Sequence, residues 1–428
     1  MEKLYIFYEK EEVGVLNYVL KDDEFFFNYN SSWQKNGFEL SPFMSFNKQI
    51  SSNTIKNFIE NLLPEGKGKE ILSTIYQISK NNLFALIKLI GEDTTGALTF
   101  KLDNKTTKTS FIEISVLELT NRIKKRKEIP ISIWNEKVRL SIAGVQDKLP
   151  LTIIDGKFGF AEGELASTHI LKFESNSDNL VLNEYLSLKL AQIAGLEIPN
   201  IEILNFDSEV VLQVERFDRQ IISKNRIARK HIIDACQALN LNVLHKYERA
   251  FGKELKEYKE GVNFKKIFSL IEKCSSPIIT KKHILTWICV NLCLGNSDAH
   301  GKNISFFIEK DKMQLTPFYD IVNIEIYENR YDTDFAMGID EAFSIKELGA
   351  YQILEFCQEL NINHKGFVGE FKKVSKAINK ALDDDIFADS ISLYSVDFYN
   401  KYKKDVKTRV EILEKKFKDS LEYAKNSD

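Results

Sequence analysis

One short polar segment constrains this chain more than any other feature. Residues 296–303 read Asn-Ser-Asp-Ala-His-Gly-Lys-Asn, so Asp298 is followed five positions later by Asn303. The apolar stretch 283–294 precedes them and predicts a buried helix that delivers the segment as a loop. In phosphoryl-transfer enzymes, an Asp and an Asn at this spacing accept the proton of the attacking hydroxyl and hold Mg²⁺. The spacing therefore predicts a catalytic loop.

A second carboxylate follows downstream. Asp320 comes directly after the apolar pair Phe318-Tyr319, at the end of a predicted hairpin strand. Because Mg²⁺ prefers oxygen ligands, Asp320 is a candidate metal ligand beside Asn303. Taken separately, Asp298 also fits a capped turn and Asp320 a strand-terminal turn.

Composition excludes several classes of protein. At 428 residues the chain is long enough for two or three structural units. A formal net charge of −3 gives no global basic field for nucleic acid. The five cysteines include no CxxC pair, which favours reduced thiols. The apolar run 284–294 is too short to span a membrane, and the first residues do not resemble a signal peptide. We expect a cytoplasmic protein with no membrane partner.

The N-terminal part predicts a small β-rich domain over residues 1–105. Aromatic and branched residues at 4–8, 13–16 and 25–27 indicate a β-meander. A helix is predicted over 55–63, with its N-cap among residues 52–54 and Pro64 closing it. The polar stretch 103–110 is typical of a linker.

The remaining sequence predicts two lobes. Over 110–230, strands at 149–153, 168–173 and 209–215 alternate with helices, as in the lobe that covers ATP in kinases. Residues 231–428 are predicted to be mostly helical. The predicted fold class is α+β: a small β-rich N-terminal domain followed by a two-lobed protein-kinase-like fold with a mostly helical C-terminal lobe.

Three segments of the first lobe are candidates for contact with nucleotide. Lys172, on a predicted strand, could face phosphates with Glu184 as its ion-pair partner, or could be an exposed edge-strand lysine. Residues 215–219 follow a strand, where the hinge between kinase lobes would lie; an exposed charged loop fits equally. Residues 141–148 could cradle phosphate with backbone amides and Lys148, or could form a hairpin turn.

Together these segments resemble the HipA family of toxin serine/threonine kinases, from bacterial type II toxin–antitoxin systems. The resemblance covers nearly the whole chain and rests on motifs in the family order. These are Asn61-Leu62-Leu63-Pro64, Gly96-Ala97, Ser141-Ile142-Ala143-Gly144-Val145-Gln146-Asp147-Lys148, Thr168-His169-Ile170-Leu171-Lys172, Asn183-Glu184-Tyr185, Glu215-Arg216-Phe217-Asp218-Arg219, Asp298-Ala299-His300-Gly301-Lys302-Asn303 and Leu315-Thr316-Pro317-Phe318-Tyr319-Asp320.

The resemblance implies roles for individual residues. Asp298 would be the catalytic base, and Asn303 and Asp320 the Mg²⁺ ligands. Ser141 matches the autophosphorylation site, where a phosphate would repel ATP phosphates and inactivate the enzyme. The implied ATP-contacting residues are Ala143, Gly144, Val145, Gln146, Asp147, Lys148, Lys172, Glu215, Arg216, Phe217, His300, Gly301, Lys302, Asn303, Tyr319 and Asp320. Asp147 stands where the family more often has Glu, and Val145 where Ala is common.

The resemblance also implies an activity and partners. The activity is that of an ATP- and Mg²⁺-dependent protein serine/threonine kinase toxin that inhibits translation and growth. Its substrate would be a protein, with an aminoacyl-tRNA synthetase as one candidate. A HipB-like helix-turn-helix antitoxin would be its partner and would carry it to operator DNA.

Two alternatives differ in class. One is a catalytically silent co-repressor that bridges the antitoxin on its operator, and the other is a kinase for a small metabolite. The simultaneous presence of Asp298, Asn303 and Asp320 favours an active enzyme over an inert scaffold.

Overall fold

The computed structural model describes residues 1–103, 108–134, 137–139, 147–174, 178–250, 257–327 and 330–427. Its contacts divide the chain into two compact units, each built from separate stretches of sequence. The first comprises Met1–Asn176, Pro199–Val243 and Ser305–Thr316, and the second comprises Ser177–Ile198, Leu244–Ile304 and Pro317–Asp428.

The first unit begins with the predicted β-meander. Its antiparallel sheet has the strand order β3-β2-β1-β4. Along β3, Phe25 and Phe27 are buried whereas Phe26 between them is 40% exposed, which is the period-two alternation of a strand with one core face. The strands are β1 (Glu2–Tyr8), β2 (Glu11–Val19), β3 (Glu24–Tyr29) and β4 (Leu98–Lys101).

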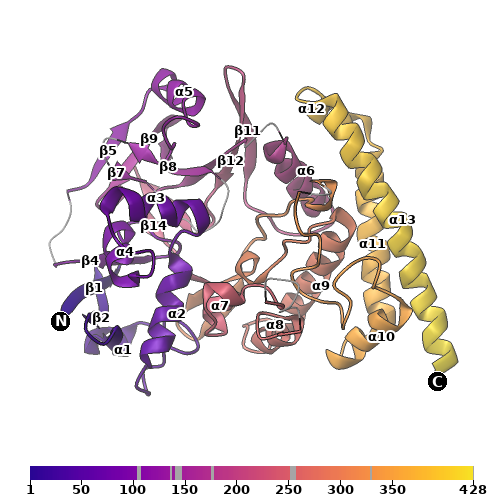
Figure 1. The fold of residues 1–428 in the computed structure, drawn as a ribbon, viewed down its shortest axis with the longest axis horizontal. Coiled ribbons are helices and arrows are strands. Elements are labelled where there is room, and N and C mark those ends of the chain that lie inside the picture. Colours follow the sequence, from indigo (N-terminus) through magenta and orange to yellow (C-terminus); the bar gives the residue numbers. More distant parts are fainter. Residues whose placement is uncertain are drawn as a thin grey trace. The chain divides into compact units, whose positions relative to one another are not determined.

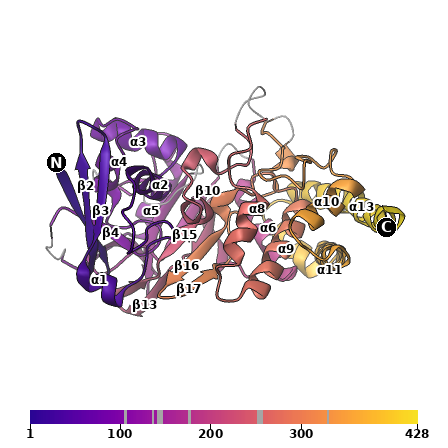
Figure 2. The same cartoon turned by 90° about the horizontal axis from the view of Figure 1, so that it is seen from below.

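Short helices accompany this sheet, and α2 lies against it (Figure 2). The predicted N-cap of α2 is wrong: the helix begins at Ser52, three residues before the predicted start, and its cap is Ser51, whose side chain accepts a hydrogen bond from the amide of Thr54. The helices are α1 (Ser31–Asn36), α2 (Ser52–Leu62), α3 (Gly66–Tyr76) and α4 (Leu83–Ile90).

A six-stranded sheet forms the second part of this unit. Its order is β11-β12-β10-β8-β9-β5, and α5 packs with it around a core that contains Trp134, Leu149 and Leu171. Its elements are β5 (Ser110–Glu113), α5 (Val116–Lys124), β8 (Lys148–Ile154), β9 (Lys157–Glu162), β10 (His169–Phe173), β11 (Ile201–Phe206) and β12 (Glu209–Glu215).

Smaller sheets complete the first unit. The hairpin β16–β17 follows the predicted catalytic loop in sequence and pairs with β15, so strands interrupt the region that was predicted to be mostly helical. These elements are β6 (Ile133–Trp134), β7 (Lys137–Val138), β13 (Arg219–Ser223), β14 (Arg226–Arg229), β15 (Ile232–Asp234), α7 (Ala235–Ala238), β16 (Ser305–Glu309) and β17 (Lys312–Leu315).

The regular elements in the described part of the second unit are helices, apart from an isolated β-bridge between Ile339 and Ala342. The helix α9 is buried on nearly every side, and α11 and α13 run side by side next to it (Figure 1). Its helices are α6 (Leu180–Ile193), α8 (Phe264–Ile271), α9 (Pro277–Leu294), α10 (Ala350–Glu359), α11 (His364–Leu382), α12 (Asp385–Ser392) and α13 (Val396–Ser427), with short 3-10 turns η1 (Val243–His245, at the boundary of the units), η3 (Gly301–Asn303) and η4 (Glu325–Tyr327).

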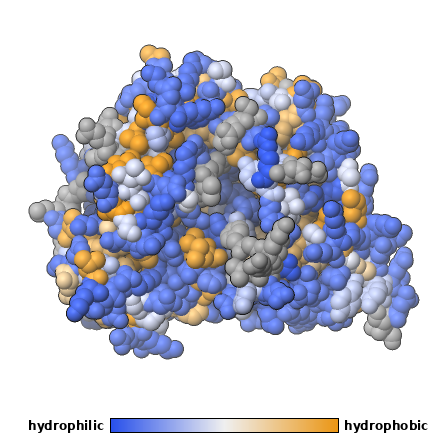
Figure 3. Space-filling model, viewed as in Figure 1, coloured by the Kyte–Doolittle hydropathy of each residue, from blue (hydrophilic) through white to orange (hydrophobic). Residues whose placement is uncertain are grey.

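The architecture confirms the predicted α+β class with a β-rich N-terminal region. The face seen in Figure 3 is mostly hydrophilic, with apolar residues scattered across it. Within the described ranges, no helix is long and apolar enough to cross a membrane.

Candidate functional site

The predicted catalytic loop begins where α9 stops. Gly295 caps this helix in the left-handed conformation, with φ of 69°. A Cβ atom at this position would lie 2.9 Å from Nε of Arg409 and 3.0 Å from Oδ1 of Asn323. The close approach and the positive φ both require glycine here, and they turn the chain sharply out of the buried helix toward Asp298.

Local hydrogen bonds fold the loop into a single turn. The amide of His300 donates to the carbonyl of Asp298 at 2.9 Å and to Oδ1 of Asn303 at 3.1 Å. The amide of Asn303 donates back to the carbonyl of His300 at 2.9 Å. Asp298 and Asn303 are therefore held on one short turn, as their spacing predicted.

The imidazole of His300 is buried inside this turn. Burial lowers its pKa well below the ordinary value of 6.5, and the nearby charges of Lys246 and Lys302 lower it further. The side chain is therefore neutral at physiological pH, and it can contribute to the loop as a hydrogen-bonding group rather than as a cation.

Asp320 lies beside the loop but not on a strand. The predicted hairpin strand is present as β17, but it ends at Leu315, five residues before Asp320. Asp320 itself has φ of 54°, a left-handed conformation that Asp tolerates better than most residues. The hydroxyl of Tyr319 donates to the carbonyl of Lys302 at 2.7 Å and ties this segment to the catalytic loop. The carboxylate of Asp320 and the carboxamide of Asn303 are oxygen donors of the kind that suits Mg²⁺.

Asn183 anchors the chain just beyond Asp320. This fully buried side chain accepts from the amide of Asn323 at 2.8 Å and donates to the carbonyl of Asn323 at 2.9 Å and to the hydroxyl of Tyr327 at 3.0 Å. The helix α6 thus fixes the segment that follows the predicted metal ligand.

In the first unit, two predicted phosphate-contacting lysines are neighbours. Lys148 on β8 is paired directly with Lys172 on β10, so both side chains lie on the same face of the sheet. They are only 7% and 6% exposed. Lys172 lies between β12 and β8, so the alternative of an exposed edge-strand lysine is wrong. Two lysines that were predicted to contact phosphate therefore lie side by side on one face of the sheet.

The segment 215–219 is not the exposed charged loop that was the alternative interpretation. Arg216, Asp218 and Arg219 are all buried, because oppositely charged side chains neutralise one another there. Nε and Nη2 of Arg216 donate to the two carboxylate oxygens of Asp218, at 3.0 and 2.8 Å. The main chain of Arg216 is also hydrogen-bonded, because its amide donates to the carbonyl of Thr168 at 2.8 Å and its carbonyl accepts from the amide of Arg219 at 3.3 Å.

This network reaches into the N-terminal domain. Arg219 donates to Oδ1 of Asp93 at 3.0 Å and to the carbonyl of Gly96 at 2.7 Å, and the amide of Gly96 donates to Asp218 at 2.9 Å. Burial alone would raise the pKa of Asp218 and of Asp93, but the surrounding arginines outweigh it and lower both. Both carboxylates are charged at neutral pH.

Some predicted residues cannot be placed. Ser141 and residues 143–146 lie outside the described residues. Asp147, which follows them, forms an ion pair with Lys67 at 3.2 Å, with both side chains partly exposed. Its main-chain carbonyl accepts a hydrogen bond from the amide of Phe173.

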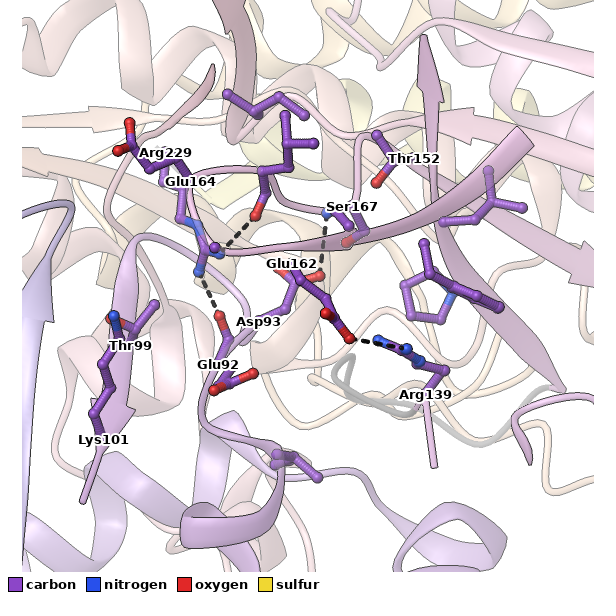
Figure 4. Close-up of a pocket in the computed structure, with 18 of the residues that line it drawn as sticks. Glu92, Asp93, Thr99, Lys101, Arg139, Thr152, Glu162, Glu164, Ser167 and Arg229 are labelled. Atoms are coloured by element: carbon purple, nitrogen blue, oxygen red, sulfur yellow. Dashed lines mark hydrogen bonds and ion pairs between the residues drawn. The ribbon is translucent and has the colours of Figure 1, made fainter. Parts of the chain in front are cut away.

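A cavity of about 470 Å³ also opens in the first unit (Figure 4). It is lined by parts of both sheets, including Arg139, Glu162 and Arg229, and it shares Asp93 with the buried network. None of the described residues predicted to contact ATP lines it.

The cysteines have no metal-binding arrangement. All five are free and buried, as expected for reduced thiols, and Cys289 and Cys293 lie on the buried helix α9. Among the described residues, no cluster of three or more His, Cys, Asp or Glu side chains could hold a metal ion. Magnesium sites in kinases use few protein ligands and complete their coordination with phosphates and water.

Sequence reasoning missed Tyr247. Its hydroxyl donates a hydrogen bond to Oδ1 of Asp298, and its ring meets that of His300 edge-on with centroids 5.0 Å apart. No motif or periodicity marks this tyrosine, and its partner lies 51 residues away.

The neighbouring Glu248 predicts a pH-dependent stability. This buried carboxyl accepts a hydrogen bond from the amide of Gly338 at 2.8 Å. Burial raises its pKa from 4.5 to about 7, and the amide of Gly338, Lys259 and Arg249 only partly oppose this, while Glu341 adds to it. Because the folded protein binds the proton more tightly, stability falls as pH rises from about 4.5 to about 7.

As the pH rises from 4.5 to 8, we therefore expect the free energy of unfolding of Glu248→Gln to increase by up to about 3 kcal/mol relative to that of wild type. Glutamine keeps an oxygen for the amide of Gly338 but cannot ionise. Urea unfolding at both pH values measures the difference, and parallel pH profiles of the two proteins would contradict the expectation.

Comparisons with known proteins agree on one family. Residues 4–101 match the HipA N-terminal domain and residues 140–382 match the HipA-like C-terminal domain. The serine/threonine-protein kinase toxin HipA of Shewanella oneidensis is 40% identical over 374 residues, which is 86% of either chain. A putative kinase, Y4mE, of Sinorhizobium fredii is 27% identical over 85% of this chain and 89% of its own.

A solved structure agrees with these sequence matches. It is that of the Shewanella oneidensis toxin–antitoxin system HipA, HipB and its operator DNA complex, and its matching chain superposes with a TM-score of 0.85. That chain is 37% identical, over 95% of this chain and 96% of its own length. The resemblance inferred from the sequence motifs is thereby confirmed, and the chain belongs to the HipA family.

Proposed function

We propose that this protein is an ATP- and Mg²⁺-dependent protein serine/threonine kinase that acts as the toxin of a HipA/HipB-like toxin–antitoxin system. The observation that carries the proposal is the turn at the end of α9, which holds Asp298 and Asn303 together while Tyr319 ties Asp320 to the same loop. Its family relative, a named serine/threonine kinase toxin, supports the same activity.

In the proposed reaction, Asp298 acts as general base. The oxygen of a serine hydroxyl forms a bond to the γ-phosphorus of ATP as the bond from that phosphorus to the bridging oxygen breaks. ADP leaves with the electron pair, and the hydroxyl proton passes to the carboxylate of Asp298. Asn303 and Asp320 would hold Mg²⁺, which neutralises phosphate charge when bound. Lys148, Lys172 and the main chain of 215–217 are proposed to contact ATP.

The proposal extends to regulation and partners. Autophosphorylation of Ser141 would place about two negative charges beside the ATP phosphates and inactivate the kinase. A HipB-like antitoxin is the proposed partner and its operator DNA is reached through it, as the composition of the related complex suggests. The substrate is proposed to be a protein of translation, such as an aminoacyl-tRNA synthetase, in a cytoplasm that keeps the five buried thiols reduced.

Intact-mass spectrometry of the purified chain tests the activity. We expect added phosphate after incubation with Mg²⁺ and ATP, none when EDTA removes the metal, and none in Ser141→Ala. If phosphate is still added to Ser141→Ala, the chain is a kinase but its autophosphorylation site is another residue. If wild type gains no phosphate and ATP does not shift its melting temperature, the enzyme proposal fails and the silent co-repressor replaces it.

A further inference from the structure

Asp298 has a hydrogen-bond partner that lies outside the family motifs identified in the sequence. The hydroxyl of Tyr247 donates to Oδ1 of Asp298, and both residues belong to the second unit. We propose that Tyr247 is a positioning residue, whose hydrogen bond fixes the orientation of the Asp298 carboxylate. This inference rests on the proposed function, because it needs Asp298 to be the base.

The main chain on either side of Tyr247 is bound to the catalytic loop and its neighbour. The carbonyl of Lys246 accepts from the amide of Gly301 at 2.9 Å. The amide of Glu248 donates to the carbonyl of Ala336 at 2.9 Å, and the amide of Ala336 donates to the carbonyl of Ser297 at 2.9 Å. The tyrosine is therefore joined to residues on both sides of Asp298.

Residues 261 and 262 also form main-chain hydrogen bonds with the segment 245–248 that contains Tyr247. The carbonyls of His245 and Glu248 accept from the amides of Val262 and Gly261, at 2.9 and 3.2 Å. Gly261 packs so closely that a Cβ atom there would lie 1.7 Å from the carbonyl oxygen of Tyr247. These bonds fix the main chain around Tyr247, and the edge-on contact with the ring of His300 packs its side chain next to the loop that carries Asp298.

This rigidity gives the hydrogen bond its proposed role. A carboxylate can rotate about its bond to Cβ, and a donor fixed on one oxygen selects one rotation. The direction in which the carboxylate meets the substrate hydroxyl is then set before the substrate binds, and such orientation accelerates the proton transfer. The proton of Tyr247 stays on the tyrosine throughout.

A different role would give the opposite result. A tyrosine hydroxyl on the base could occupy the place of the substrate hydroxyl and block the site, as a pseudosubstrate does. A blocking residue must move away for activity, whereas the ring of Tyr247 packs edge-on against His300, a buried residue of the same loop. The geometry therefore favours support over blockage.

The test compares full-length wild type, Tyr247→Phe and Tyr258→Phe. The first variant removes one hydroxyl and keeps the ring against His300. The control makes the same change at a tyrosine that is 61% exposed in the chain segment before Gly261. For each protein we would measure phosphate incorporation at saturating ATP, the half-saturating ATP concentration, and the melting temperature.

We expect the saturated rate of Tyr247→Phe to fall about 10-fold, the scale of one lost hydrogen bond to a charged group. The half-saturating ATP concentration should stay within about twofold, because the lost interaction does not bind ATP. Tyr258→Phe should match wild type. An unchanged or faster rate in Tyr247→Phe would overturn the inference while wild-type activity upholds the proposed kinase. An inactive wild type would overturn both.

Discussion

Asp298→Asn is expected to slow ATP-dependent phosphate incorporation by about 10²–10⁴-fold at saturating ATP, the usual contribution of a general base. Asparagine has nearly the shape of aspartate and keeps an oxygen that can accept from the hydroxyl of Tyr247. It cannot take up the proton of the attacking hydroxyl. The loss should therefore fall on the chemical step, and ATP affinity should stay within about threefold of wild type.

The measurement is a time course of intact mass at saturating ATP, with ATP affinity followed by thermal shift. Asp332→Asn is the matched control. Asp332 is exposed, and its carboxylate accepts from the amide of Asp334 at 3.0 Å, a bond that the carboxamide can also accept. A wild-type rate in Asp298→Asn would remove Asp298 from the role of base. An equal loss in both variants would point to a general effect on the fold instead.

The sequence predicts the parts of this site whose geometry is set locally. Asp298 and Asn303 are five residues apart, and the bonds that hold them run within residues 298–303. The apolar stretch 283–294 predicted the helix before the loop, and α9 ends at Leu294. Likewise, the alternation of residues 168–173 identifies β10 and hence the face that carries Lys172.

Other features depend on contacts that no local pattern encodes. Tyr247 reaches Asp298 across 51 residues, and Asp93 reaches Arg219 across 126. Charged runs such as 215–219 are usually exposed, so their burial can be recognised only when the neutralising partners are known. The left-handed backbone of Asp320 could not be predicted from the sequence either, because a positive φ is uncommon in residues other than glycine.

The buried network around Asp218 should be the largest single determinant of stability that we can test in the first unit. We expect Asp218→Ala to lower the free energy of unfolding by about 3–5 kcal/mol. The substitution leaves Arg216 and Arg219 buried without the carboxylate that lies between them, at 2.8 and 2.7 Å from their guanidinium nitrogens. It also removes the acceptor of the Gly96 amide.

Two further variants serve as comparisons, one that removes only the charge of Asp218 and one that breaks an exposed ion pair. Asp218→Asn keeps an oxygen for the Gly96 amide but removes the negative charge, so we expect a smaller loss of about 1–3 kcal/mol. Lys157→Ala breaks the exposed ion pair with Glu113, in which both side chains are more than half exposed, and should cost less than about 1 kcal/mol. Urea unfolding monitored by circular dichroism and tryptophan fluorescence gives all three values.

The ranking of these three losses is what tests the argument. If burial makes the network essential, the loss in free energy of unfolding must be larger for Asp218→Ala than for Asp218→Asn. Both losses must be larger than that for Lys157→Ala, because water stabilises the partner left behind only at the exposed pair. A loss for Asp218→Ala as small as that for Lys157→Ala would mean that water reaches the two arginines once the carboxylate is gone. The network would then stabilise the fold no more than an exposed ion pair does. It would no longer explain how the loop that contains Gly96 is fastened to the segment 215–219.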